Sequence, residues 1–373
     1  MRVGVFTYGI QHPDRLTGIP RYTMELTRAL TRLNADLEIV LLNPYPESEI
    51  GWYSEFESVA VRSLQRLPAA ATWGNLVLNV LARKAELDVF HDPCGIAPFL
   101  VSRPPYARVV TIHDVFARVV PSTQDPLMRL LYSTLLPLTR HTADAVLTVS
   151  EASRRDLHRY LGLPADRTFV TPLGFTLPEQ APLNTDAVPS LKMPYFLFVG
   201  NLTPRKNLLR VIQAFVLLRK DEPGLTLKIV GPKFWGSDEI SALARETPGV
   251  ELTGFVSEAE LDRLYRGARA LVFPSLYEGF GLPALEAMAR GCPVIGSNVS
   301  SLPEVIGDAG LQVDPHSVEA IAGAMRQLQV PELRATLRAR GLLRAGAYSW
   351  RTTAEQTLAV YQTVLDRRRT AHR

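Results

Sequence analysis

The chain has 373 residues, of which 46% are hydrophobic and 21% charged, so it is long enough for two globular domains with ordinary cores. Lysine and arginine total 41 against 37 acidic residues, and the net charge of +4 suits anionic ligands without indicating nucleic-acid binding. The two cysteines, Cys94 and Cys292, lie far apart with no Cys/His cluster, which excludes a disulfide scaffold and disfavours a zinc site.

Short apolar runs alternate with longer amphipathic stretches through the first half of the chain. We expect strands at Val3–Phe6, Leu37–Leu42, Val89–His91, Arg108–Ile112 and Ala145–Val149. A helix is expected over Ile19–Leu33, and another follows the N-cap Ser150 and ends near Leu161. This alternation predicts a parallel sheet with helices on both faces.

The alternation breaks between Pro172 and Pro194, where prolines interrupt any periodicity. It restarts with strands at Tyr195–Val199, Thr226–Val230, Leu271–Pro274 and Pro293–Ile295, and with helices at Pro204–Lys220, Pro283–Arg290 and Ser349–Arg368. We therefore predict a first domain over 1–177, a linker over 178–193, a second domain over 194–346 and a C-terminal segment over 347–373 whose helix packs back on the first domain. The expected fold class is α/β, with two Rossmann-like, doubly wound parallel-sheet domains facing across a cleft.

The strongest candidate for chemistry is the segment from Phe273 to Glu286, because ligands of parallel sheets bind beyond the carboxyl ends of the strands. Glu278 would lie in a loop after a strand and Glu286 early in the next helix, where both carboxylates could accept hydrogen bonds from sugar hydroxyls. Gly279 and Gly281 would allow close backbone approach, and the helix start favours an anion such as a diphosphate. The alternative is an ordinary turn and a glutamate that only favours the helix dipole.

A second candidate is the basic segment that follows the first strand of the second domain. Thr203 is expected to cap a helix whose first turn contains Arg205 and Lys206. Two cations at the positive end of a helix are unfavourable by up to about 1 kcal/mol each, and a bound diphosphate would explain them. A solvated basic helix end is the alternative.

Two segments of the first domain also carry polar residues at the ends of strands or starts of helices. His113 ends a strand and could bond a substrate hydroxyl, with Asp114 orienting its loop; either His113 or the similar His91 could instead be structural, and we favour His113 for function. At the start of the first helix, in Thr17-Gly18-Ile-Pro-Arg21-Tyr22, Gly18 could let a phosphate or substrate approach closely, and Arg21 could contact the acceptor or a phosphate.

Several function classes lose their main support. The first strand–helix turn lacks GxGxxG, and GxxxxGK[ST], HExxH and GxSxG are absent, which argues against dinucleotide oxidoreductases, P-loop NTPases, metalloproteases and serine hydrolases. The opening lacks a signal-peptide pattern and no apolar run reaches about 18 residues, so we expect a cytoplasmic protein without a membrane span. The stretch Val61–Lys84 could form a basic amphipathic helix resting on an anionic membrane, or a core-facing helix with a solvated edge.

Taken together, these motifs resemble the retaining glycosyltransferases of family 4, which have the two-domain GT-B architecture, and in particular its mannosyltransferase-like branch. The resemblance spans nearly the whole chain, and its E-x7-E pattern with Phe280-Gly-Leu-Pro is quite specific. The motifs that carry it, in order, are Gly18-Ile-Pro-Arg-Tyr, Ile112-His-Asp, Thr148-Val-Ser-Glu, Pro204-Arg-Lys-Asn and the element from Glu278 to Glu286.

The resemblance assigns roles residue by residue. The residues it implies for catalysis are His113, which contacts the donor sugar, Glu278, which approaches it, and the diphosphate-binding Arg205 and Lys206. Those implied for donor binding are Gly18, Asn201, Gly279, Phe280, Gly281, Leu282 and the ribose-binding Glu286. Arg21, Tyr22 and Asp114 are expected to bind the acceptor. One departure is Asn201, where many members carry an arginine, so the charge clamp would rest on the Arg205–Lys206 pair.

The resemblance also implies a chemistry. The nucleotide diphosphate leaves, the acceptor hydroxyl attacks from the same face, and no metal, cofactor or covalent nucleophile is needed. We expect a hexosyltransferase for polysaccharide biosynthesis that moves mannose from GDP-mannose to a saccharide or lipid-linked acceptor, with peripheral contact at the inner membrane face and no nucleic-acid partner. UDP-glucose is the nearest rival donor. A sugar-nucleotide epimerase of the same fold, or a non-catalytic basic binding protein, remain the alternatives from other classes.

Overall fold

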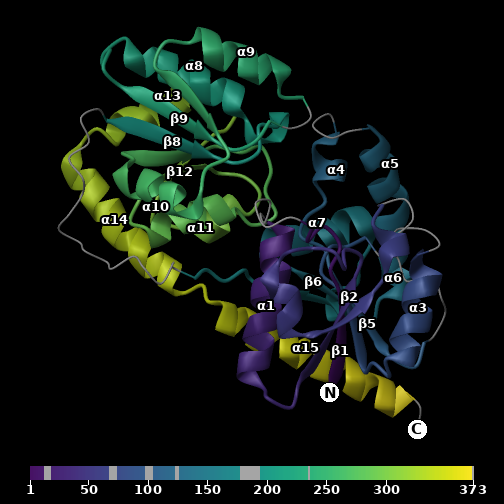
Figure 1. Cartoon of the computed structure of the whole chain (residues 1–373). Helices are drawn as coiled ribbons and strands as arrows, with labels where there is room; N and C mark the ends of the chain where they lie inside the picture. Colours follow the sequence, from purple (N-terminus) through teal and green to yellow (C-terminus); the bar gives the residue numbers. More distant parts are fainter. Residues whose placement is uncertain are drawn as a thin grey trace. The chain divides into compact units, whose positions relative to one another are not determined.

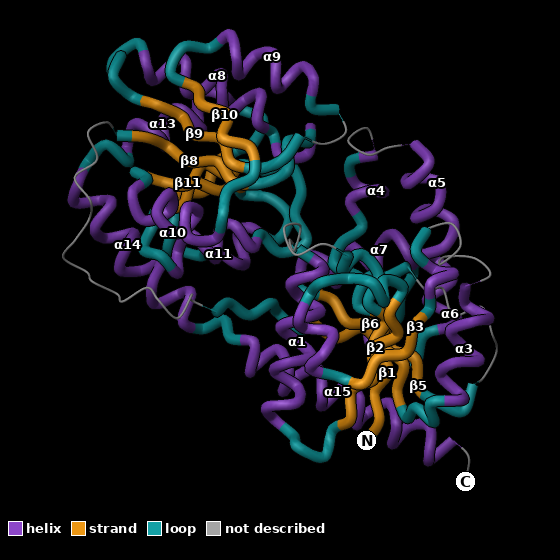
Figure 2. Tube along the Cα trace, in the orientation of Figure 1, coloured by secondary structure: helices purple, strands orange, loops and turns teal. Residues whose placement is uncertain are grey.

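The computed structural model describes residues 1–11, 18–66, 74–96, 104–121, 126–176, 194–233 and 236–371. The chain forms two compact units. Unit 1 comprises Met1–Arg118, Pro126–Gly174 and Ser349–Arg373, and unit 2 comprises Val119–Asp125 and Phe175–Tyr348. In each unit the strands form a central layer with helices on both faces (Figures 1 and 2). The linker predicted over 178–193 lies outside the described residues.

Unit 1 is built on a parallel sheet. Its strands are β1 (Arg2–Phe6), β2 (Glu38–Asn43), β3 (Glu57–Ala60), β4 (Val89–Asp92), β5 (Ala107–Thr111), β6 (Ala145–Thr148) and β7 (Thr168–Val170). They are ordered β3-β2-β1-β4-β5-β6-β7, and each described neighbouring pair is parallel. The carboxyl ends of these strands therefore lie along one edge of the sheet.

The helices of unit 1 cover both faces of this sheet. They are α1 (Ile19–Leu33), α3 (Gly74–Lys84), α4 (Phe116–Val119), α5 (Pro126–Leu135), α6 (Thr139–Thr142), α7 (Glu151–Leu161) and α15 (Trp350–Ala371). The predicted N-cap of α7 is confirmed, because the Ser150 hydroxyl accepts a hydrogen bond from the Ser153 amide at 3.0 Å. The C-terminal helix α15 contacts α1, β5 and β6, and its Thr353 hydroxyl donates to the Pro172 carbonyl at 2.6 Å. Helix α15 is thus an integral part of unit 1.

Unit 2 repeats this plan with a second parallel sheet. Its strands are β8 (Tyr195–Val199), β9 (Thr226–Val230), β10 (Val250–Gly254), β11 (Ala270–Phe273), β12 (Val294–Ser297) and β13 (Leu311–Val313), in the order β10-β9-β8-β11-β12-β13. Its helices are α8 (Leu208–Arg219), α9 (Asp238–Glu246), α10 (Glu258–Gly267), α11 (Leu282–Ala289), α12 (Leu302–Ile306), α13 (Val318–Gln327) and α14 (Pro331–Gly346). Helices α8 and α13 pack together, and α11 packs against α14 (Figure 1). The two-domain α/β fold predicted from the sequence is confirmed.

The prediction of a helix over Pro204–Lys220 is wrong for its first residues, because α8 begins only at Leu208. Residues Pro204–Lys206 form a separate 3₁₀ turn, and Asn207 then adopts the left-handed conformation, with φ 63°, before α8 begins. The Asn207 side-chain amide donates to the carbonyls of Pro274 at 2.9 Å and Pro315 at 2.6 Å, which holds this conformation. The Thr203 side chain makes no cap bond. Arg205 and Lys206 therefore lie in a tight turn after β8 instead of the first turn of α8.

Candidate active site

Two segments that are remote in sequence meet at the carboxyl edge of the unit 2 sheet. The Lys206 Nζ donates to Glu278 Oε1 at 2.6 Å, and Arg205 Nη1 lies 3.0 Å from Glu278 Oε2. Arg205 also donates to the Tyr277 carbonyl at 2.5 Å. They meet because β8 and β11, the strands that precede the basic turn and the glutamate, are paired in parallel. We call Arg205, Lys206 and Glu278 the charged cluster.

The charged cluster is largely removed from water. The side chains of Arg205, Lys206 and Glu278 are 17%, 11% and 8% exposed. Burial alone would raise the pKa of Glu278, but the positive charges of Arg205 and Lys206 outweigh it and lower that pKa to about 2. Lys206 Nζ also lies 4.7 Å from the centre of the Phe273 ring, a stabilising cation–π contact. Two cations and one anion leave the cluster positively charged, which suits an anionic group such as a diphosphate.

The loop that carries Glu278 is fixed by two serines at the start of α12. The Ser300 hydroxyl accepts from the Glu278 amide at 3.2 Å and donates to the Glu278 carbonyl at 2.6 Å. The Ser301 hydroxyl lies 2.9 Å from the carbonyls of both Glu278 and Phe280. Sequence reasoning gave these serines no role, since nothing local marks them as partners of a loop more than 20 residues away.

The remaining residues of this loop are compatible with the prediction that a ligand approaches its backbone closely. Gly281 has φ 102°, and a Cβ there would lie 2.5 Å from Leu302 Cδ2, so this position requires glycine. Phe280 is buried, and its ring packs edge-on against Tyr348 at 5.6 Å, so only its backbone is available to a ligand. Gly279 is buried beside it, and Leu282 is half-buried at the start of α11.

Glu286 is contacted by Tyr265 of α10 and by Arg290 at the C-terminal end of its own helix α11. The Tyr265 hydroxyl donates to Glu286 Oε2 at 3.2 Å, and burial raises the pKa of Tyr265, which keeps this phenol protonated. The Arg290 guanidinium donates to the Glu286 carbonyl at 3.2 Å and to Asp262 Oδ1 at 2.9 Å. It lies 5.1 Å from the Tyr265 ring centre. Sequence reasoning missed Tyr265 and Arg290, because an aromatic and a basic residue on helices carry no local signal of this contact.

Asn201 is separated from the end of β8 by Gly200 and is half-buried, with its carbonyl accepting from the Thr203 amide at 2.9 Å. It therefore opens the turn that positions Arg205 and Lys206.

In unit 1, His113 follows β5 at the carboxyl edge of the sheet. Its Nε2 lies 2.9 Å from the Pro93 carbonyl, which can only accept, so Nε2 carries the proton and Nδ1 is the acceptor nitrogen of the ring. Burial lowers the pKa of His113 to about 4, which keeps the imidazole neutral at pH 7. The Tyr22 ring meets the His113 ring edge-on, with centroids 4.9 Å apart.

The other candidate residues of unit 1 differ in exposure. Gly18 is exposed and precedes α1 with φ 58°, and no atom of the described residues lies within 4 Å of where its Cβ would be. Arg21 is half-buried on α1. Asp114 accepts from the Phe116 amide at 3.2 Å and so caps α4. Tyr22 is 0% exposed and its hydroxyl bonds Thr111 at 3.0 Å, so direct acceptor contact does not fit this placement, and we assign it to support of His113.

His91 has a structural role, which the sequence analysis gave as the alternative to a role in function. It is 0% exposed on β4, with Nδ1 2.7 Å from the Tyr361 hydroxyl and Nε2 2.8 Å from the Thr111 hydroxyl. The following Asp92 accepts the backbone amides of Cys94 at 2.9 Å and Ile96 at 2.7 Å. Both ring nitrogens of His91 thus lie within hydrogen-bond distance of hydroxyl groups of unit 1.

Comparisons with known proteins decide the family. Residues 16–177 match the family model described as Glycosyltransferase Family 4, and residues 185–341 match the one described as Glycosyl transferases group 1. The O-antigen chain mannosyltransferase B of Escherichia coli is 32% identical over 386 residues, which cover 97% of this chain and 100% of that protein. The chain belongs to glycosyltransferase family 4.

A second relative of this glycosyltransferase is the MMP alpha-(1->4)-mannosyltransferase of Mycolicibacterium hassiacum, 27% identical over 98% of this chain and 99% of that protein. Among solved structures, sucrose-phosphate synthase from Thermosynechococcus elongatus matches with a TM-score of 0.79 and 21% identity, over 98% of this chain and 99% of that chain. This likeness shows the GT-B fold. The glycosyltransferase relatives imply a nucleotide-sugar donor and a saccharide acceptor.

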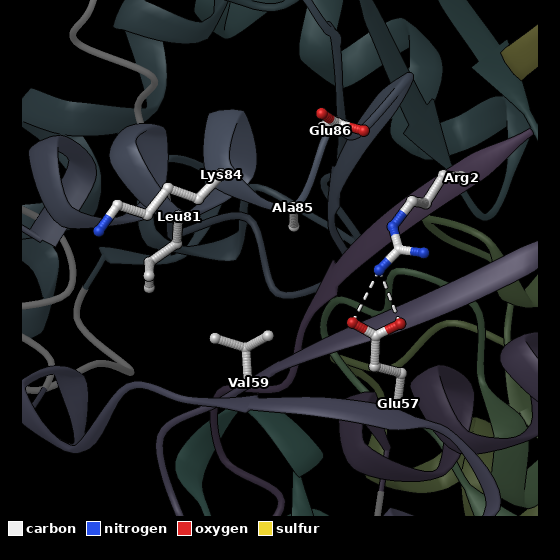
Figure 3. A pocket seen from close by; sticks show the side chains of 7 residues that line it. All are labelled: Arg2, Glu57, Val59, Leu81, Lys84, Ala85 and Glu86. Carbon is white, nitrogen blue, oxygen red and sulfur yellow. Dashed lines mark hydrogen bonds and ion pairs between the residues drawn. The ribbon is translucent and has the colours of Figure 1, made fainter.

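A hollow of about 470 Å³ lies at the other end of the unit 1 sheet of this glycosyltransferase (Figure 3). It is lined by Arg2, Glu57, Val59, Leu81, Lys84, Ala85 and Glu86. The Arg2 guanidinium donates to both carboxylate oxygens of Glu57, at 2.7 and 2.6 Å, and to Glu38 at 2.7 Å. Because these contacts tie the amino ends of three strands together, we assign the hollow to strand-end packing and not to the active site.

Two further findings concern metals and membranes. Within the described ranges of this glycosyltransferase, no three His, Cys, Asp or Glu side chains are grouped so that they could hold a metal ion. None of the helices in those ranges is long and apolar enough to cross a membrane. In the stretch predicted to be amphipathic, Leu78 and Ala82 of α3 are buried, whereas Leu76 and Val80 are 59% and 50% exposed.

Proposed function

We propose that this glycosyltransferase transfers mannose from GDP-mannose to a saccharide or lipid-linked acceptor, with retention of the anomeric configuration and without a metal ion. The observation that carries the proposal is the charged cluster, in which two largely buried cations converge at the end of a parallel strand. Mannose is supported by two relatives that are named as mannosyltransferases, at 32% and 27% identity.

In the proposed reaction, the bond between the anomeric carbon and the β-phosphate oxygen breaks, and GDP leaves with the electron pair. Arg205 and Lys206 would stabilise the negative charge that develops on the diphosphate, and such preorganised charges can supply several kcal/mol. The acceptor hydroxyl attacks the anomeric carbon from the same face, and its proton passes to the leaving phosphate oxygen. Glu278, ionised at neutral pH, would accept a hydrogen bond from a sugar hydroxyl.

The remaining roles follow from the same geometry. The neutral His113 would accept a hydrogen bond from a donor-sugar hydroxyl at Nδ1, because Nε2 is engaged by the Pro93 carbonyl. Glu286, oriented by Tyr265, would accept the ribose hydroxyls of the nucleotide. The backbone of Gly279–Leu282 would contact sugar or phosphate. Gly18 would approach a phosphate, and Arg21 and Asp114 would lie on the acceptor side.

The proposal places the enzyme in the cytoplasm, in peripheral contact with an anionic membrane. The exposed Leu76 and Val80 of α3 precede Arg83 and Lys84 in the last turn, and apolar side chains beside basic ones favour an anionic lipid surface. Such contact would bring a lipid-linked acceptor to the enzyme.

The experiment is a transfer assay with the full chain, a mannose-containing oligosaccharide or lipid-linked saccharide, and GDP-mannose or UDP-glucose, with EDTA present. We expect mannose transfer from GDP-mannose, with an α-linked product in the NMR spectrum, since the donor is α-linked. Transfer only from UDP-glucose would overturn the donor, and a β-linked product would overturn retention. Conversion of the donor to an epimeric nucleotide sugar without acceptor would instead indicate an epimerase.

A further inference from the structure

A continuous chain of buried polar groups in unit 1 runs from the C-terminal helix to His113. The Tyr361 hydroxyl of α15 lies 2.7 Å from His91 Nδ1, and His91 Nε2 lies 2.8 Å from the Thr111 hydroxyl. The Tyr22 hydroxyl of α1 lies 3.0 Å from the same Thr111 oxygen. The Tyr22 ring then meets the His113 ring edge-on at 4.9 Å and 89°. Four elements, α15, β4, β5 and α1, each contribute to this chain.

The hydrogen-bonding groups of this chain are closed off from bulk water. Tyr361, His91, Thr111 and Tyr22 are each 0% exposed. Burial lowers the pKa of His91 to about 3, so its ring is neutral and has one donor and one acceptor nitrogen. The Thr111 hydroxyl has a single proton, so it can donate to only one of His91 and Tyr22 and must accept a hydrogen bond from the other. Removing the Tyr361 hydroxyl takes away the partner of His91 Nδ1 and so affects the tautomer of the ring that bonds Thr111.

The chain ends on a histidine whose other contacts leave it little freedom. His113 Nε2 is bonded to the Pro93 carbonyl at 2.9 Å, and its own carbonyl accepts from the Ser153 hydroxyl at 3.0 Å. The Tyr22 ring packs against the imidazole and is itself fixed by its bond to Thr111. The orientation of the ring, and hence the direction of Nδ1, depends on where Tyr22 is held.

We propose that Tyr361, His91, Thr111 and Tyr22 are positioning residues for His113, so that the C-terminal helix sets the orientation of the histidine at the donor sugar. This inference rests on the proposed role of His113 in transfer. It gives α15 a function in catalysis beyond its packing on unit 1.

The first test compares two hydroxyl deletions on the same helix. Tyr361→Phe keeps the ring and removes the hydroxyl that bonds His91, and we expect kcat to fall about tenfold with less than a twofold change in the KM for the donor. Thr357→Val is the matched control, because Thr357 is also 0% exposed on α15 but donates within the helix to the Thr353 carbonyl at 2.8 Å. It should stay within twofold of wild type. Equal losses in both variants would overturn the proposal.

A double-mutant test separates positioning from general damage. In a His113→Ala background, Tyr361→Phe should cause no further loss of kcat, because the residue through which it acts is gone. The same tenfold loss in both backgrounds would overturn the proposal. Should Tyr361→Phe fail to fold, Thr111→Val and Thr111→Ser replace it: the valine variant should lose activity, and the serine variant, which retains a hydroxyl, should recover most of it.

A spectroscopic readout tests the inference independently of the proposed function. In ¹⁵N-histidine-labelled wild-type protein, the His113 signals, assigned with His113→Ala, should report a single tautomer protonated at Nε2. Tyr361→Phe should shift these signals or mix the tautomers, whereas Thr357→Val should not. Unchanged His113 signals in Tyr361→Phe would overturn the inference. If instead the wild-type protein transferred no mannose but showed the expected shifts, the proposed function alone would fail.

Discussion

Lys206 and Glu278 are 72 residues apart in the sequence, yet Lys206 Nζ donates to Glu278 Oε1 at 2.6 Å in a largely buried site. The contact follows from topology, because the strands before these residues are parallel neighbours. Desolvating these charges costs free energy even when they are paired, and the second cation, Arg205, leaves the cluster with a net positive charge at the end of the sheet.

Replacement of Lys206 tests this role directly. Lys206→Ala should lower kcat/KM by about a hundredfold or more, equivalent to about 2.7 kcal/mol, because one of the two charges facing the leaving diphosphate is lost. Lys228→Ala is the control, since Lys228 pairs with Glu251 at 2.7 Å in the same unit, away from the charged cluster. Steady-state kinetics of both variants measure the difference, and near-wild-type activity of Lys206→Ala would contradict the role.

Glu278 should matter for stability as well as for catalysis. Glu278→Gln leaves Arg205 and Lys206 buried without the carboxylate charge, so the free energy of unfolding at pH 7 should fall by about 3 kcal/mol. Glu251→Gln removes a half-exposed partner of Lys228 and should change the free energy of unfolding by less than about 0.5 kcal/mol. Denaturant unfolding measures both, and equal effects would show that the charged cluster contributes no more than a surface pair.

The pH dependence of stability follows from the same carboxylate. Its folded-state pKa is lowered from 4.5 to about 2, so the stability it contributes is fully present above about pH 4.5 and is lost as pH falls toward 2. Between these values, the unfolding free energy of the wild type should fall more steeply than that of Glu278→Gln. Parallel pH curves for the two proteins would mean that the pKa of Glu278 is not lowered by folding.

Tyr265 should affect binding of the donor and not the chemical step. Tyr265→Phe removes the hydroxyl that orients Glu286, so the KM for the donor should rise about tenfold while kcat changes less than twofold. Tyr195→Phe is the control, because its buried hydroxyl donates to the Leu264 carbonyl at 2.7 Å in the same unit without contacting Glu286. A fall in kcat with unchanged KM in Tyr265→Phe would assign the tyrosine a different role.

Gly281 should tolerate no side chain. Gly281→Ala would force a Cβ to 2.5 Å from Leu302 at φ 102°, so we expect a loss of about 1–3 kcal/mol in stability together with loss of transfer activity. Gly323→Ala provides the contrast, because Gly323 lies within helix α13 with nothing within 4 Å of the added Cβ, and the change should be stabilising by up to about 1 kcal/mol. Thermal unfolding and activity of the two variants measure both effects.

The sequence predicted the buried strands to within one or two residues, because each is a continuous apolar run flanked by turns. Strands β3, β7, β10 and β13 were not predicted, and each lies at an edge of its sheet, where half-exposed side chains blur the apolar signal. The left-handed conformation of Asn207 was also missed, since it is held by hydrogen bonds to the Pro274 and Pro315 carbonyls, which only the folded unit brings close to Asn207.

The candidate site could be predicted in part for similar reasons. Residues in the loops that follow strands, such as Lys206, Glu278 and His113, are visible as polar exceptions after apolar runs. Their supports are not visible, because Tyr265 and Tyr361 lie on helices, 21 and 270 residues from their partners Glu286 and His91, and look like core residues. The burial of Tyr22 was not foreseen for the same reason: its motif neighbours are more exposed, but the helix turns its side chain inward.

Donor binding tests the central claim most directly. Thermal unfolding of the full chain would be measured with GDP-mannose, GDP, UDP-glucose, UDP and guanosine, each with EDTA present. A ligand at 100 times its dissociation constant adds about 2.7 kcal/mol, so we expect clear stabilisation by GDP-mannose and GDP, little by guanosine, and loss of the effect in Lys206→Ala but not in Lys228→Ala. Stabilisation by UDP-glucose and UDP alone, or equal stabilisation of the Lys206→Ala variant, would contradict the account.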